Sequence, residues 1–117
     1  MKHLCAFQLL KMVGPEEFHV PVWKPLMDVY RTESGWLLKF ELAGVQMRDV
    51  KLEVEGRTVR LSGIRRDTVC GRMREHYAME IAYSRFERSV ELPCNVSEAR
   101  VNSKISDGML LVQIETL

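Results

Sequence analysis

The chain is short of the residues that would give it a covalent framework, a membrane span or a strong electric field. Its three cysteines, Cys5, Cys70 and Cys94, are far apart and contain no Cys-x-x-Cys pair, which argues against a disulfide framework and favours reduced thiols. Seventeen basic and sixteen acidic residues give a net charge of +1, so no overall field attracts nucleic acid or an anionic membrane. No stretch approaches the ~18 consecutive apolar residues of a membrane span.

Side chains suited to catalysis are also few. The three histidines, His3, His19 and His76, fall in a connector or a long loop, and the sequence contains no phosphate-binding loop, nucleophile elbow or cluster of metal ligands. The His3-x-Cys5 pair supplies only part of the roughly four ligands that a metal site requires. We therefore expect neither an enzyme nor a bound metal or other cofactor.

The N-terminal stretch is apolar but does not match a secretion signal. Gln8 and Lys11 interrupt it, and no small-x-small cleavage site follows. Together with reduced cysteines, this predicts a cytoplasmic protein. Pro15, Pro21 and Pro25 then break any helix and favour an extended connector.

The strongest structural signal is an Asp107-Gly108 turn between two strands. Asp and Gly tolerate the positive φ that both central positions of a type I′ turn require. Such a turn predicts a register that puts five apolar side chains on one face. Its pairs are Ser106 with Met109, Ile105 with Leu110, Ser103 with Val112, and Val101 with Ile114.

Period-two alternation predicts the other strands. A second hairpin is expected around a Glu55-Gly56 loop, which would pair Leu52 with Val59. Pro93 ends another strand because it cannot donate to a ladder. The seven expected strands cover residues 26–31, 36–42, 50–54, 57–61, 86–92, 101–106 and 109–114.

Seven strands with one apolar face each predict an antiparallel, immunoglobulin-like β-sandwich, since a second sheet must cover each face. We expect this domain over residues 26–117, after an apolar arm and proline-containing connector over residues 1–25. Residues 64–84 do not follow the strand pattern. This stretch is too long for an inert connection in a compact domain, so it should be functional, disordered or engaged elsewhere.

Several local patterns occur in an order that is more specific than any one of them. They are Asp28-Val29-Tyr30, Phe40-Glu41-Leu42-Ala43-Gly44-Val45, Val59-Arg60-Leu61-Ser62-Gly63, residues 83–93 and residues 103–110. The first three resemble the first core strand, the acidic-Leu-Pro-Gly-Val turn and the Leu-x-Ile-x-Gly strand of the α-crystallin domain. Residues 83–93 resemble its arginine-bearing strand, and residues 103–110 resemble its Ala-x-x-x-Asn-Gly-Val-Leu signature. This is the domain of the small heat-shock proteins, and the resemblance, closest to bacterial-type members, spans residues 26–115.

The departures from the family pattern are mild within the domain. Ala43 stands where Pro is usual, Ser103 where Ala is, and Asp107 and Met109 where Asn and Val are. The sequence also stops at Leu117 without the Ile-x-Ile tail through which family members usually bridge dimers. This argues against high-order assembly through such a tail.

Arg88 falls on the face of its strand that should be buried, where a lone cation is costly. Two interpretations stay open. The side chain reaches solvent at a sheet edge, or it pairs with a carboxylate at a subunit contact, as the matching arginine of the family implies. Asp28 and Glu75 are the conceivable carboxylate partners.

In bacterial-type members of the resembled family, a strand from the long loop exchanges onto the partner's first core strand. The resemblance therefore implies a homodimer in which residues 72–77 meet residues 27–31 of a second copy, and which can assemble further. The alternative is a solvated loop. The dimer-contact candidates are Arg72, Arg74, His76, Tyr77, Asp28, Tyr30 and Arg88.

A groove between residues 50–54 and 103–105 is where the family's tail would dock. The segment Val20-Pro21-Val22 has the same apolar-x-apolar spacing, and Pro21 favours the extended shape of such a ligand. Val20 and Val22 are thus candidates to fill the groove of their own or a neighbouring chain, with an ordinary packed linker as the alternative. The groove candidates are Leu52, Val54, Ser103 and Ile105.

The arm is apolar on nearly every side, so another surface must cover it. Burial within an oligomer and capture of unfolding proteins are both open. The client-binding candidates are Leu4, Phe7, Leu9, Leu10 and Met12.

The resemblance implies an ATP-independent holding chaperone that binds partly unfolded proteins through exposed hydrophobic surface. The alternative is a co-chaperone-like β-sandwich module that docks on one defined partner, because sandwiches of both kinds share this architecture. Acidic residues dilute the arginines of the long loop, so we expect no nucleic-acid partner, and no membrane partner either.

Overall fold

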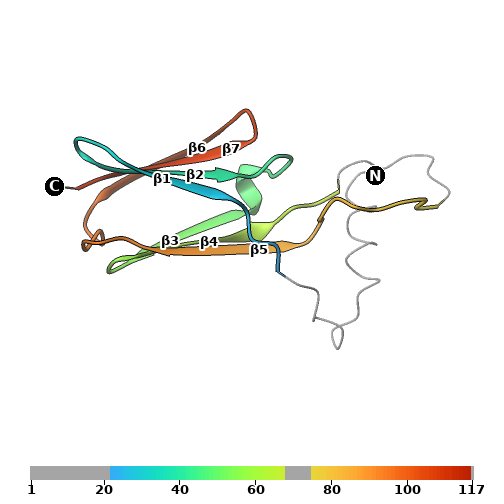
Figure 1. Ribbon diagram of the computed structural model, residues 1–117, viewed down its shortest axis with the longest axis horizontal. Helices are drawn as coiled ribbons and strands as arrows, with labels where there is room; N and C mark the ends of the chain where they lie inside the picture. The colour runs from blue at the N-terminus through green and yellow to red at the C-terminus, as the bar shows by residue number, and fades with distance from the viewer. Residues whose placement is uncertain (1–21, 68–74, 117) are drawn as a thin grey trace.

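A computed structural model describes residues 22–67 and 75–116, and these contain seven strands and one short 3-10 helix (Figure 1). The strands lie where the alternation of the sequence predicts them, to within a few residues. Their bounds are β1 Met27–Arg31, β2 Gly35–Glu41, β3 Val50–Glu55, β4 Thr58–Ile64, β5 Arg85–Glu91, β6 Arg100–Ser106 and β7 Met109–Glu115, with the 3-10 helix η2 at Met47–Asp49.

The strands form two sheets that face each other, with order β1-β2-β7-β6 in one and β3-β4-β5 in the other (Figure 1). All neighbouring strands pair antiparallel. The predicted antiparallel β-sandwich is therefore confirmed.

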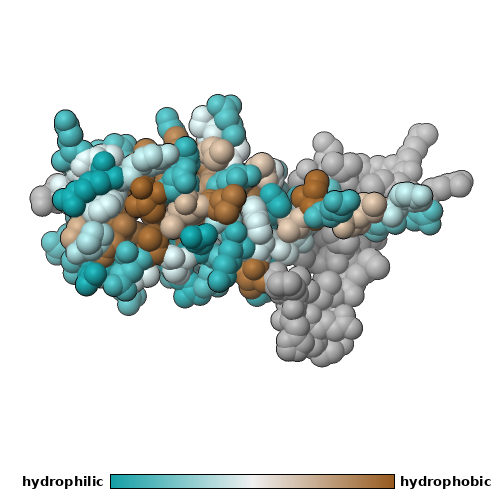
Figure 2. Space-filling view, viewed as in Figure 1, coloured by the Kyte–Doolittle hydropathy of each residue, from teal (hydrophilic) through white to brown (hydrophobic). Residues whose placement is uncertain are grey.

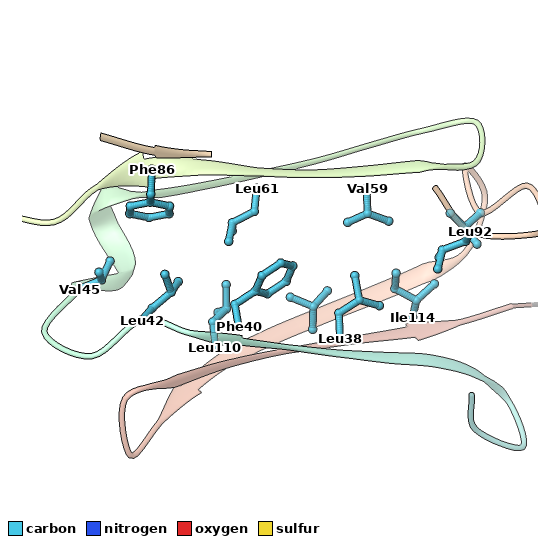
Figure 3. Close-up of a cluster of buried hydrophobic side chains, with 12 residues drawn as sticks. Leu38, Phe40, Leu42, Val45, Val59, Leu61, Phe86, Leu92, Leu110 and Ile114 are labelled. Carbon is cyan, nitrogen blue, oxygen red and sulfur yellow. The ribbon is translucent and has the colours of Figure 1, made fainter. Parts of the chain in front are cut away.

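The core lies between the sheets and is built from alternate residues of the strands (Figure 3). Leu38 and Phe40 of β2 point toward Val59 and Leu61 of β4, and each of the four is at most 1% exposed. Burying an apolar side chain of this size contributes about 1.5–3 kcal/mol. The remaining buried apolar residues are Leu42, Val45, Phe86, Leu92, Val96, Leu110, Val112 and Ile114.

The hairpin between β6 and β7 has the predicted turn and register. Asp107 and Gly108 have φ of 52° and 77°, as a type I′ turn requires. The four predicted residue pairs are all present. The turn also closes the end of the neighbouring strand, because the carbonyl of Gly108 accepts a hydrogen bond from the N–H of Leu42 at 2.8 Å.

The predicted register of the β3–β4 hairpin is wrong by two residues. Leu52 pairs with Leu61 rather than with Val59, because the two-residue loop is Gly56-Arg57. Gly56 has φ of 62° at the first central position, as a type II′ turn requires. A shift of two residues preserves the faces of the strands, so the core prediction is unaffected.

Contacts with the β5–β6 connection fix this turn in place. The N–H of Gly56 donates to Oγ of Ser97 at 2.7 Å, and its carbonyl accepts from the N–H of Val96 at 2.8 Å. Nε of Arg57 donates to the carbonyl of Leu92 at 3.0 Å. These tertiary hydrogen bonds, which local turn rules do not include, favour the observed loop over Glu55-Gly56.

The long connection between β4 and β5 contains no strand in its described parts, residues 65–67 and 75–84. The exchanging strand predicted over residues 72–77 is thus not a strand in its described part, residues 75–77, in this single chain. Residues 72–74 lie outside the described residues.

Gly63 occupies a position in β4 where a side chain does not fit. A Cβ atom there would meet the backbone oxygen of Asp49 and lie 2.5 Å from Cζ of Phe86. The glycine of the Leu-x-Ile-x-Gly pattern therefore allows the ring of Phe86 to close one end of the core (Figure 3).

We predict that Gly63→Ala lowers the free energy of unfolding by about 1–3 kcal/mol, the usual range for overpacking a core. Equilibrium urea unfolding measures the change. Ser62→Ala, on the outer face of the same strand, is the matched control and should change stability by less than about 0.5 kcal/mol. Equal losses in both variants would contradict the steric explanation.

Candidate functional site

The short connector before β1 defines one side of the sandwich. The N–H of Trp23 donates to the carbonyl of Arg85 at 3.0 Å, and the carbonyl of Trp23 accepts from the N–H of Glu87 at 3.1 Å. The connector thus pairs in parallel with the start of β5 before the chain enters β1. Because the connector passes from β5 to β1 within a few residues, these two end strands lie on the same side of the sandwich. The other two end strands, β3 and β6, lie along the opposite side.

The outer edge of β1 is open. Among the described residues, β1 is hydrogen-bonded to β2 alone. Leu26 is 70% exposed and Val29 is 38% exposed beside this edge. Figure 2 shows hydrophobic side chains on this face, in the region where Figure 1 places β1 and β5. An unpaired edge with apolar side chains is a template for a strand from another chain.

Asp28 and Tyr30, both predicted dimer contacts, lie with Lys39 on the outer face of β1 and β2. The hydroxyl of Tyr30 donates to Oδ2 of Asp28 at 3.4 Å, and Nζ of Lys39 lies 3.7 Å from the same oxygen. The hydrogen bond with Tyr30 raises the pKa of Lys39 above its ordinary value, and the charge of Asp28 adds to the effect. Asp28 therefore already has a cationic partner within its own chain.

Arg88 is partly buried at the edge of β5, where it contacts the connector. Its Nη1 donates to the carbonyl of Pro25 at 3.1 Å. Within residues 22–67 and 75–116 no carboxylate forms an ion pair with it. A single chain thus supplies a neutral acceptor, and pairing with a carboxylate of a second subunit stays a prediction.

The described part of the long loop exposes a row of apolar side chains. Tyr77, Met79 and Ile81 are 98%, 46% and 62% exposed. Their alternate spacing is that of one face of an extended strand. Glu75 and His76 are also exposed, whereas the predicted contacts Arg72 and Arg74 lie outside the described residues.

The residues predicted to line a groove belong to the two remaining edge strands, β3 and β6. Leu52, Val54 and Ile105 are partly buried and pack against the core, and Ser103 is exposed. Val22 is 46% exposed and adjoins Trp23 beside β5, the opposite edge of that sheet from β3. Filling of the groove by a neighbour's Val22 stays a prediction.

Several candidates lie outside the described residues. These are the groove-filling candidate Val20 and the client-binding candidates Leu4, Phe7, Leu9, Leu10 and Met12.

The described residues contain neither a metal-binding cluster nor a membrane-spanning helix. No group of three or more His, Cys, Asp or Glu side chains in residues 22–67 and 75–116 is placed to hold a metal ion. No helix in these ranges has the length and apolar character needed to cross a membrane.

Sequence reasoning missed one cluster, where the connector meets the base of the long loop. The guanidinium of Arg65 stacks on Trp23, with Cζ 3.9 Å from the ring centroid. The next residue, Arg66, forms an ion pair with Asp49, with Nε 3.3 Å from both carboxylate oxygens. No spacing pattern in the sequence indicates these contacts, because the partners are distant along the chain.

Comparison with known proteins identifies the family. Residues 28–117 match the Hsp20/alpha crystallin family. The chain belongs to this family. The resemblance of the local patterns to small heat-shock proteins is thereby confirmed.

Curated relatives in the family are named small heat shock proteins or heat shock proteins. The chain is 26% identical over 90 residues to small heat shock protein C2 of Rickettsia felis, covering 77% of this chain and 58% of the relative. It is 29% identical over 92 residues to the 22.7 kDa class IV heat shock protein of Pisum sativum, covering 78% and 47%. The chain thus spans about half to three fifths of the length of such relatives.

Solved structures share the fold of the Hsp20 domain described here. Heat shock protein 16.0 of Schizosaccharomyces pombe has a TM-score of 0.69 at 21% identity, covering 81% of this chain and 88% of that one. A small heat-shock protein of Xylella fastidiosa, described as having a distinct high order structure, has a TM-score of 0.65 at 20% identity, covering 81% and 87%. The sandwich is therefore the α-crystallin domain of the family.

We predict that Arg88→Ala lowers the thermal midpoint by about 4 °C, since it removes the hydrogen bond to Pro25 and the packing of the side-chain stem. Scanning calorimetry measures the midpoint, and light scattering measures the mass of the protein in solution. Arg60→Ala is the control, because Arg60 pairs with Glu87 at 2.7 Å on an exposed face, where ion pairs contribute little. If Arg88→Ala leaves both midpoint and mass unchanged, the subunit-pairing hypothesis for Arg88 is wrong.

Proposed function

We propose that this protein is an ATP-independent holding chaperone that binds partly unfolded proteins and suppresses their aggregation. Membership of the Hsp20/alpha crystallin family supports a chaperone role. The mechanism is binding without turnover, so the protein is not an enzyme. It works in the cytoplasm with reduced cysteines, in keeping with the free, exposed thiol of Cys94.

The observation that carries the proposal is that one chain presents both an open strand edge and a row of exposed apolar side chains. Within the described residues, the outer edge of β1 has no paired strand, and the side chains of Leu26 and Val29 are exposed beside it. The loop offers Tyr77, Met79 and Ile81 at strand spacing. Such surfaces are rare on a protein that works alone, because they promote association.

The first association is with a second copy of the chain. The loop strand of one subunit adds to β1 of its partner, and the row of Tyr77, Met79 and Ile81 extends the docking segment beyond residues 72–77. Exposed β-strand edges accept such added strands through main-chain hydrogen bonds, and alternate side chains provide specificity. Reciprocal exchange produces a homodimer with two such docking sites.

The second association is with clients. Leu4, Phe7, Leu9, Leu10 and Met12 of the arm contact apolar segments that unfolding proteins expose, and the unbranched Met side chain adapts to different partners. In larger assemblies, Val20 and Val22 of one subunit fill the groove between β3 and β6 of a neighbour. Client binding and assembly then use separate parts of the connector and arm.

The chaperone proposal predicts that the full-length chain suppresses heat-induced aggregation of an unrelated protein without ATP. Light scattering follows the aggregation of that protein over time. Replacing Phe7, Leu9, Leu10 and Met12 together with Ser should remove most of the protection, because it removes the apolar contacts of the arm.

The control replaces exposed Met47 with Ser, since Met47 lies on η2, outside both the arm and the proposed dimer contacts. If neither the native chain nor the control protects the client from aggregation, the proposed holding function is wrong. That result would favour the alternative, a module that docks on one defined partner.

The dimer proposal predicts that a Tyr77→Ser, Met79→Ser, Ile81→Ser triple variant has the mass of a monomer in light scattering. These side chains are exposed in the single chain, so the stability of the monomer should stay within about 0.5 kcal/mol. Met47→Ser is the control, because Met47 is 43% exposed, close to the 46% of Met79, but lies on η2. A triple variant that remains a stable dimer would overturn the loop-exchange proposal.

A further inference from the structure

The connector and the long loop leave the sandwich at the same end (Figure 1). Arg65 lies at this junction, immediately after β4, and contacts both segments. Its guanidinium stacks on Trp23 of the connector, with Cζ 3.9 Å from the ring centroid. Its Nε donates to the carbonyl of Ala82 at the end of the loop at 2.9 Å. One side chain therefore contacts two segments that are distant in sequence.

The backbone of Arg65 closes the base of the loop. Its N–H donates to the carbonyl of Ser84 at 3.0 Å. Its Nη1 donates to the carbonyl of Ala43 at 3.2 Å, which fixes the guanidinium to the turn after β2. The position of the guanidinium is thus determined from three directions, by Ala43, Ala82 and the Trp23 ring.

Trp23 also contacts β5, through both its ring and its backbone. Its ring meets the buried ring of Phe86 edge to face, with centroids 5.7 Å apart and planes at 77°. Its backbone exchanges hydrogen bonds with Arg85 and Glu87 of β5. The indole therefore lies between the core and Arg65, where movement of either neighbour changes its contacts.

The chemistry of this junction requires arginine. A guanidinium is planar and carries donors at fixed angles, so it can stack on an indole while Nε and Nη1 donate to two different carbonyls. Lysine keeps the charge and the aliphatic stem, but it has a single donor group and no plane to stack. The substitution Arg65→Lys therefore keeps the charge at the junction while removing its stacking and hydrogen-bond geometry.

We propose that Arg65 is a positioning residue that couples the N-terminal connector to the long loop. When Trp23 leaves its place beside β5, Arg65 loses its stacking surface and the hydrogen bond to Ala82 weakens. When Ala82 leaves, the stack on Trp23 weakens by the same factor, because coupling between two sites is reciprocal. A stack of this kind, worth about 1 kcal/mol, corresponds to a coupling factor of about five.

The consequence for the protein rests on the proposed function. The client-binding arm precedes Trp23, and the segment proposed to join subunits precedes Ala82. Occupancy of the arm by a client therefore changes the rate at which subunits exchange. The coupling itself depends on the contacts within one chain.

Amide hydrogen exchange of the full-length chain, resolved to single residues by fragmentation mass spectrometry, tests the coupling. In Arg65→Lys, the N–H of Trp23 should exchange about five-fold faster, although its acceptor, the carbonyl of Arg85, is untouched. In Trp23→Leu, the N–H of Arg65 should accelerate by a similar factor. Arg66→Lys is the control, since the guanidinium of Arg66 pairs with Asp49, whereas that of Arg65 stacks on Trp23.

Unchanged exchange at Trp23 in Arg65→Lys would overturn the coupling, and so would equal acceleration in Arg66→Lys. Acceleration across all strands would mean general destabilisation and would also overturn it. If Trp23→Leu does not fold, the measurement on the milder Arg65→Lys variant still decides whether the coupling exists.

Subunit exchange between labelled dimers tests the consequence separately. Arg65→Lys should exchange subunits about five-fold faster than the native chain. A protein that forms no dimer would contradict the proposed function, while the hydrogen-exchange result would still decide the coupling. A dimer whose exchange rate is unchanged in Arg65→Lys would overturn the link between the junction and assembly.

Discussion

Contact between the apolar faces of two sheets holds this molecule together. Each strand presents alternate residues to one side, so either sheet alone would leave its apolar face in water, with Phe40 on one sheet and Leu61 on the other. Facing sheets bury both sets at once (Figure 3). The positions of the turns, the connector and the long loop all follow from the need to bring these two faces into register.

The same arrangement leaves edges that the single chain does not cover in its described parts. β1 and β5 lie on one side of the sandwich, and β3 and β6 lie on the other. In its described part, residues 22–25, the connector contacts β5 through Trp23 and Pro25. The proposed exchange of loop strands and the proposed filling of the groove are both ways of completing a sheet that one chain leaves incomplete.

The sequence predicted the fold well where local chemistry decides the structure. Asp107-Gly108 fixed both turn type and register, because two consecutive residues that tolerate positive φ fit one turn. The Gly56 turn was misplaced, because its position depends on hydrogen bonds to Ser97 and Val96, far along the chain. The stack of Arg65 on Trp23 was missed for the same reason, since strand periodicity carries no information about contacts between distant loops.

The hydrogen bond between Gly56 and Ser97 joins residues 41 positions apart, and the one between Arg88 and Pro25 joins residues 63 apart. Contacts of this kind reward the chain only after long segments have been brought together, which slows folding. During that interval the strand edges of the nascent chain are unpaired. A protein whose proposed work is to shield incompletely folded chains must therefore pass through a vulnerable state of the same kind each time it is made.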